Sequence, residues 1–111
     1  ERGARRMTLQ QLKAVLDGTG LPWAYRQWEE GEAPALPYGV FYAGRSNPFG
    51  ADGVVYSSSQ RYTLELYSRD KDPESEAVVE GALTTAGIFY TKDEAYISSE
   101  RMNEVIYEIE V

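Results

Sequence analysis

Two segments in which apolar and polar residues largely alternate constrain the fold of this chain most. Residues 60–68 read QRYTLELYS, and residues 102–111 read MNEVIYEIEV. Successive side chains of a β-strand point to opposite faces, so each segment would bury one face and expose the other. The apolar set is Tyr62, Leu64, Leu66, Val105, Tyr107, Ile109 and Val111. The opposite set is Arg61, Thr63, Glu65, Tyr67, Glu104, Glu108 and Glu110. The pattern predicts two half-buried strands of an antiparallel sheet.

Two helices are indicated by their end signals. Thr8 and Gln11 have the spacing of a capping box, and leucine and valine then recur at helical intervals up to Asp17 and Gly18. The second helix begins with Asp72 as N-cap and Pro73 at its first position, with Glu74 and Glu76 in the first turn and a stop at Gly87. Its apolar stripe is Val78, Val79, Ala82, Leu83 and Ala86, and the small residues Gly81 and Ala82 are expected to permit close packing on a sheet.

The remaining strands are expected at residues 23–28, 38–42 and 88–92, with strand character resuming at Val54 before the first alternating segment. Residues 29–37 and 93–101 are expected to be connections. The fold class is therefore α+β, with a single antiparallel or mixed sheet, two helices on one face, and the order α-β-β-β-α-β-β. Residues 7–111 form one domain, and residues 1–6 are expected to be a leader, upstream residues or an expression-derived extension before a natural start at Met7.

The connection after Tyr42 is far longer than a hairpin requires, and it contains Gly44, Gly50 and Gly53. We interpret it as a long β-hairpin arm that is stable only against another copy of the chain. The expected interface residues of the arm are Arg45, Asn47, Pro48, Phe49 and Asp52.

Composition closes many routes to catalysis. The 111 residues include no cysteine and no histidine, which removes thiolate chemistry, the commonest general base and the commonest transition-metal ligand. The formal net charge is −7, with 18 acidic residues against 11 basic ones, and this balance disfavours gripping nucleic acid. No apolar run is long enough for a membrane span. We therefore expect a non-enzymatic protein without cofactor, metal or membrane association.

The acids Glu104, Glu108 and Glu110 share one face of the last strand, where carboxylates could bind a divalent cation or act as acid and base in glycoside hydrolysis. A solvated strand face is the favoured interpretation, because no calcium-loop pattern supplies further oxygen ligands. A small carboxylate-dependent enzyme is left as the least favoured alternative.

The chain resembles the small tail-completion and tail-terminator proteins of siphophage-type phages and prophages. The likeness covers residues 7–111 and lies in the long loop before YTLELYSRDKD, the DPESEAVVE helix, its LTTAGIF exit and the closing MNEVIYEIEV strand. It implies a structural virion subunit, made in the host cytoplasm, that forms a ring, typically hexameric, at the head–tail junction or neck.

Such a ring caps the tail tube and joins it to the head connector, so its implied partners are further copies of the chain, the tail tube protein and the connector or adaptor protein. DNA would be passing cargo, and Glu104, Glu108 and Glu110 would be the channel-facing acids. An acidic lumen would repel DNA weakly instead of holding it. A head-side connector or adaptor, and a monomeric accessory or inhibitor protein that binds a host protein, remain alternatives.

Overall fold

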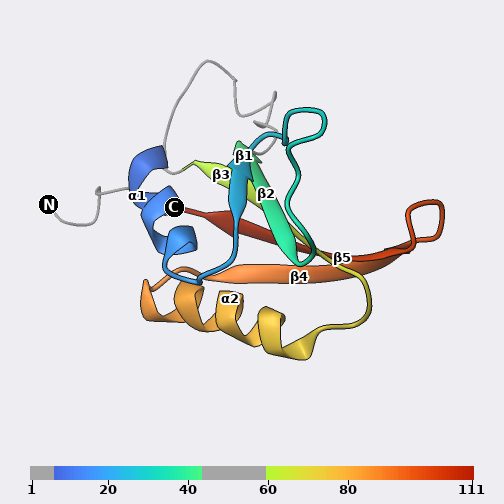
Figure 1. Ribbon diagram of the computed structural model, residues 1–111. Coiled ribbons are helices and arrows are strands. Elements are labelled where there is room, and N and C mark those ends of the chain that lie inside the picture. Colours follow the sequence, from blue (N-terminus) through green and yellow to red (C-terminus); the bar gives the residue numbers. More distant parts are fainter. Residues whose placement is uncertain (1–6, 44–59) are drawn as a thin grey trace, which may run out of the picture.

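A computed structural model describes residues 7–43 and 60–111 of the chain (Figure 1). The elements are α1 (Leu9–Asp17), β1 (Trp23–Tyr25), β2 (Tyr38–Ala43), β3 (Arg61–Ser68), α2 (Pro73–Thr85), β4 (Tyr90–Ile97) and β5 (Met102–Glu110). This order confirms the expected α+β class and the sequence α-β-β-β-α-β-β. Among the described residues, no helix has the length and hydropathy that crossing a membrane requires.

The five strands form one mixed sheet in the order β1-β2-β3-β5-β4. β1 pairs with β2 in parallel, and the other three pairings are antiparallel. Both helices lie on one face of the sheet, as Figure 1 shows. The arm expected between β2 and β3 falls outside the described residues.

The core lies between the helices and the apolar faces of the strands. The buried half of the alternation expected for β3 and β5 is confirmed, since Leu64, Leu66, Val105 and Tyr107 are almost completely buried. Thr63, expected on the exposed face of β3, is also buried. The helices contribute Leu12 and Leu16 from α1, and Val79 and Leu83 from α2. Burial of these apolar side chains is the main favourable contribution to folding.

The helix ends form as expected. The Thr8 hydroxyl accepts a hydrogen bond from the Gln11 backbone N–H at 3.1 Å, while the Thr8 N–H donates to Gln11 Oε1 at 2.8 Å. Asp72 caps α2 by accepting from the Ser75 N–H at 3.1 Å, and Pro73 occupies the first helical position. Gly87 follows the helix with a φ of 76°, a conformation that favours glycine.

Several boundaries differ from the sequence-based expectation. β1 stops at Tyr25 instead of residue 28, because Arg26 adopts a φ of 77°, which is not an extended conformation. The Arg26 N–H still donates to the Phe41 carbonyl, as the last bond of the parallel pairing. β4 extends to Ile97 instead of ending at residue 92, so only a short turn at residues 98–101 joins it to β5. Pairing with eight residues of β5 overrides the weak strand preference of its acidic residues.

The small residues of α2 also have a different place from the one expected. Gly81 is exposed, and together with Ala82 it lines a groove between α1 and α2 instead of a close contact with the sheet. Val78, expected in the buried stripe, is 43% exposed. Fewer apolar residues of α2 are therefore buried against the sheet than the expected stripe contains.

Gly39 of β2 is required by the packing of β1. It lies opposite Trp23 in the parallel pair, and a Cβ atom at Gly39 would come within 2.4 Å of the Trp23 ring. Trp23 is only 5% exposed, so its ring has little freedom to move aside.

We predict that Gly39→Ala lowers the free energy of unfolding by about 1–3 kcal/mol, because the added methyl group overpacks the Trp23 contact. Gly81→Ala is the matched control, since nothing lies within 4 Å of a Cβ there and alanine favours the helix by up to about 1 kcal/mol. Urea unfolding measures both variants. Equal stabilities for Gly39→Ala and the parent protein would contradict the packing described here.

Candidate functional site: the open face of the sheet

The face of the sheet opposite the helices is covered by neither helix (Figure 1). The strand registers place its residues in cross-strand rows, and acidic residues are present on three of the five strands. These acids are Glu65, Asp93, Glu104, Glu108 and Glu110. Among the strand residues of this face, Arg61 is the one basic residue, and it lies opposite Glu110. We call this surface the open face.

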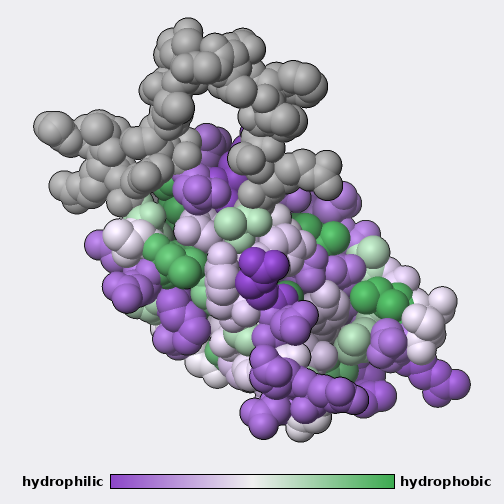
Figure 2. All heavy atoms as spheres, turned by 90° about the horizontal axis from the view of Figure 1, so that it is seen from above, coloured by the Kyte–Doolittle hydropathy of each residue, from purple (hydrophilic) through white to green (hydrophobic). Residues whose placement is uncertain are grey.

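The described residues on the side of the molecule away from α2 are predominantly polar. Figure 2 shows hydrophilic residues spread across the part of this side that is not drawn in grey, with hydrophobic residues in separate small patches. Thus no broad apolar surface is visible there, and an interaction through this side would depend on charge and on single aromatic or aliphatic contacts.

The three acids expected to face a channel do share this face. Glu108 and Glu110 are exposed, whereas Glu104 is only partly exposed. The expected common orientation is therefore present on β5. The expected arm residues Arg45, Asn47, Pro48, Phe49 and Asp52 lie outside the described residues.

Two tyrosines and two glutamates form a hydrogen-bonded cluster on the open face. Tyr42 Oη donates to Glu65 Oε2 at 2.6 Å, and Tyr67 Oη donates to Glu65 Oε1, also at 2.6 Å. Tyr67 Oη also lies 3.3 Å from Glu104 Oε2. Because a phenol has one proton, the short contact to Glu65 leaves Glu104 with the weaker bond. The cluster ties together β2, β3 and β5.

The environment shifts the pKa values of the cluster upward. Burial, together with the hydrogen bond to Glu65, raises the pKa of Tyr42 to about 12. Burial and Glu65 also raise the pKa of Tyr67. Burial and the negative charge of Glu65 raise the pKa of Glu104, against a smaller opposing effect of the bond from Tyr67. Both tyrosines therefore remain neutral donors at physiological pH, and Glu104 takes up a proton more readily than an ordinary glutamate.

Aromatic rings continue from this cluster toward the edge of the sheet. The Tyr67 and Tyr38 ring centroids are 5.7 Å apart, and Tyr38 meets Trp28 edge-on at 6.1 Å. The open face thus combines acids with neighbouring aromatic rings, a composition found in protein contact surfaces.

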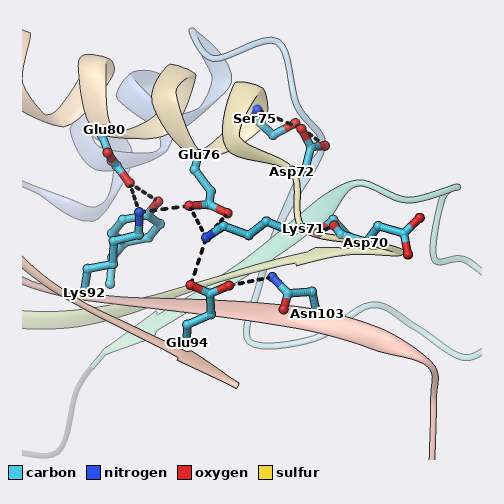
Figure 3. A network of polar contacts seen from close by, with 11 residues as sticks. Asp70, Lys71, Asp72, Ser75, Glu76, Glu80, Lys92, Glu94 and Asn103 are labelled. Atoms are coloured by element: carbon cyan, nitrogen blue, oxygen red, sulfur yellow. Dashed lines mark hydrogen bonds and ion pairs between the residues drawn. The ribbon is translucent and has the colours of Figure 1, made fainter. Parts of the chain in front are cut away.

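A second polar network lies on the opposite side of the sheet, between α2 and β4 (Figure 3). Glu76 is 4% exposed and lies 2.8 Å from Lys92 Nζ and 2.9 Å from Lys71 Nζ. Lys92 also contacts Glu80 at 2.7 Å, and Lys71 contacts Glu94 at 2.8 Å. We call these five residues the α2–β4 network.

Tyr107 and Asn103 extend the α2–β4 network from β5. Tyr107 Oη donates to Glu80 at 2.8 Å, and Asn103 donates to Glu94 at 3.3 Å. Burial opposes ionisation of Glu80, but Lys92 and Tyr107 outweigh it and lower the Glu80 pKa. A carboxylate with a lowered pKa stabilises the fold at neutral pH, and this contribution is lost as the pH falls through the lowered value. Lowering the pH should therefore weaken the attachment of α2 to β4.

Sequence reasoning assigned Glu76 only to the helix dipole and did not assign Glu80 or Lys92 any role. A usable signal existed, because Glu76 and Glu80 fall at helical spacing with the buried residues Val79 and Leu83. Acids within an apolar stripe require partners, and Lys92, the last residue of the strand expected at 88–92, was a candidate.

Neither cluster is arranged as a metal centre. Within residues 7–43 and 60–111, no group of three or more acidic side chains is positioned to hold a metal ion. The arrangement on the open face instead presents fixed negative charge beside aromatic rings, and such a surface can repel polyanions or contact another protein.

Comparison with protein-family models finds no match, and comparisons with curated proteins and with solved structures find none either. The likeness to tail-completion proteins therefore rests on the sequence pattern and is developed below as a proposal.

We predict that Glu104→Gln stabilises the protein at pH 7. A carboxyl group whose pKa is raised on folding favours the fold at low pH, and this advantage is lost as the pH rises through the raised value. The neutral glutamine avoids the repulsion from Glu65, with a gain of at most about 1 kcal/mol because the site is partly exposed.

Urea unfolding at pH 7 and at pH 4 tests this prediction, with the gain expected to shrink at pH 4. Glu108→Gln, an exposed position on the same face, serves as control and should change the stability by about 0.5 kcal/mol or less. An equal gain at both pH values, or a loss at pH 7, would contradict the proposed repulsion.

We further predict that Glu76→Gln lowers the free energy of unfolding by about 1–3 kcal/mol. This loss is smaller than that expected from breaking a fully buried ion pair, because the lysines bound to Glu76 are partly hydrated. Their side chains are 49% and 35% exposed for Lys71 and Lys92. Glu74→Gln, an exposed acid in the same helical turn, should cost no more than about 1 kcal/mol. Equal losses in thermal or urea unfolding would argue against a structural role for the α2–β4 network.

Proposed function

We propose that the chain is a structural virion protein of a phage or prophage, a tail terminator or tail-completion subunit of the neck. In this proposal it assembles into a ring, six subunits being the number that the family resemblance implies. The ring caps the tail tube and joins it to the head connector, with DNA as passing cargo.

The observation that carries the proposal is the acidic open face. The strand residues on this face include five acids and one arginine, while the helices and their apolar contacts are confined to the opposite face. A ring with this face toward the lumen would offer DNA a repulsive wall, because both carry negative charge. A protein that must let DNA pass benefits from such a wall, since positive contacts would retain the phosphates.

The hydrogen-bonded cluster supports a passive role for this wall. Tyr42 and Tyr67 direct their hydroxyl groups to Glu65, so the largest side chains there are held by neighbours on the same sheet. Negative charges fixed in this way keep their positions without a bound ligand. The aromatic rings beside them suit contacts with a neighbouring subunit, the tube protein or the connector.

The association state tests the proposal directly. Light scattering over a concentration series, alone and with the tail tube protein, should reveal a ring-sized assembly, and negative-stain electron microscopy should show a central opening. Species no larger than a dimer under all these conditions would refute the ring. A ring that binds the connector but not the tube would instead support the head-side alternative.

We predict that Glu108→Lys converts the wall into a DNA-binding surface. Ring symmetry repeats the substitution in every subunit, so several phosphate contacts arise at once, and each contributes about −0.9 to the slope of log affinity against log salt. The parent protein should not bind duplex DNA at physiological salt in a mobility-shift assay.

Glu74→Lys is the matched control, because it makes the same charge change at an exposed position of α2, on the helix side of the sheet. It should bind DNA much more weakly than Glu108→Lys. Comparable binding by both variants, or clear binding by the parent protein, would defeat the assignment of the open face to a DNA channel.

A further inference from the structure

Among residues 7–43 and 60–111, no strand pairs with the outer edge of β4. Within that part of the chain, β4 is the last strand in the sheet order and pairs with β5 over eight residues. The strand at the other edge, β1, has only three residues. An edge of this length presents a row of backbone donors and acceptors that can pair with a further strand.

The charges that usually discourage such pairing are largely neutralised on β4. Lys92 is held by Glu76 and Glu80, and Glu94 by Lys71, within the α2–β4 network (Figure 3). Asp93 points to the other face and is the one charged residue of β4 outside that network. Its carboxylate accepts a hydrogen bond from the Glu94 N–H at 3.1 Å.

Exposed aromatic residues mark both ends of this edge. Phe89, directly before β4, is 93% exposed, and Tyr96, next to its last residue, is 60% exposed. These are the two most exposed of the large hydrophobic side chains in the described part of the chain. A partner strand that covered the edge would also remove both rings from water, which is favourable.

We propose that β4 pairs antiparallel with β4 of a second copy, about a two-fold axis at Asp93. In this register Lys92 lies opposite Glu94 of the second copy, and Tyr90 lies opposite Tyr96.

On the other face, Thr91 lies opposite Ala95. Just beyond, Phe89 meets Ile97, which pairs with the partly buried Met102 in its own chain. One register thus matches opposite charges and covers both exposed rings.

Neighbouring registers are less favourable. In a two-fold antiparallel pair, a residue on one face of the sheet must lie opposite a residue on the same face of the second copy. The axis must therefore pass through a residue position, and not between two residues. An axis at Lys92 sets two lysines opposite each other, and an axis at Glu94 sets two glutamates opposite each other. Neither of these registers places Lys92 opposite Glu94, whereas the axis at Asp93 does so twice. The axis at Asp93 also opposes two like charges, but on the open face, where water screens them.

This pairing is independent of the proposed ring. A two-fold contact uses the same surface on both copies and is complete with two, so it cannot extend around a ring. It can join two free subunits or two rings. Finding or not finding this pairing therefore neither supports nor contradicts the proposed ring, which is tested separately.

Single cysteines test the register, because the 111-residue sequence contains none. In Asp93→Cys the two cysteines would face each other at a distance that permits a disulfide. In Ala95→Cys the two cysteines would be offset by four residues, about 13 Å, which is too far. Ala95→Cys is thus a control on the same strand and face.

Under mild oxidation, Asp93→Cys should form a covalent dimer at least tenfold faster than Ala95→Cys at equal concentration. A mixture of Thr91→Cys and Ala95→Cys should form the mixed dimer preferentially over either homodimer. Equal rates for all variants, or no covalent dimer of Asp93→Cys, would overturn the proposed pairing. Circular dichroism verifies that each variant is folded.

Asp93→Asn provides a test without cross-linking. It removes the like-charge pair on the axis, so sedimentation velocity should show a dimer several-fold tighter than that of the parent protein. Weaker or unchanged association would overturn the proposed axis, because no other register places Asp93 opposite itself.

Discussion

The antiparallel pairing of β3 with β5 at the centre of the sheet is the constraint on which the rest of the structure depends. Eight residues of each strand are paired, from Arg61 with Glu110 to Ser68 with Asn103. A shift by one residue would turn every side chain of a strand to the wrong face. The register therefore separates an apolar face, which the helices cover, from a face that carries glutamates and tyrosines.

The edge position of β4 explains why polar side chains attach it to α2. Its position at the edge gives it few apolar contacts, and most of its side chains are exposed. The α2–β4 network supplies a polar attachment instead, with the buried Glu76 between two lysines. The same attachment neutralises Lys92 and Glu94, which makes the free edge of β4 suited to a further strand.

Much of the fold could be predicted because it is encoded locally. The alternation in β3 and β5 and the caps at Thr8 and Asp72 require only near neighbours, so they were readable from sequence. The shared face of Glu104 and Glu108 followed from the same two-residue period.

Features that depend on contacts between distant segments could not be predicted in this way. The full length of β4 depends on its ladder with β5, and the cluster of Tyr42, Glu65 and Tyr67 depends on the register of β2 with β3. The burial of Glu76 depends on lysines from two other segments. Sequence periodicity assigns a residue to a face but does not identify its cross-strand partners.

Carboxyl footprinting tests the central claim that one face of the sheet is an open, acidic surface and the other is sealed. Native protein is treated with a carbodiimide and an amine, and the labelled positions are read by mass spectrometry. Rapid labelling of Glu108 and protection of Glu76 are the expected result, because Glu108 is exposed while Glu76 is 4% exposed. Labelling of Glu76 as fast as Glu108 in the folded protein, or protection of Glu108 in a verified monomer, would contradict the account.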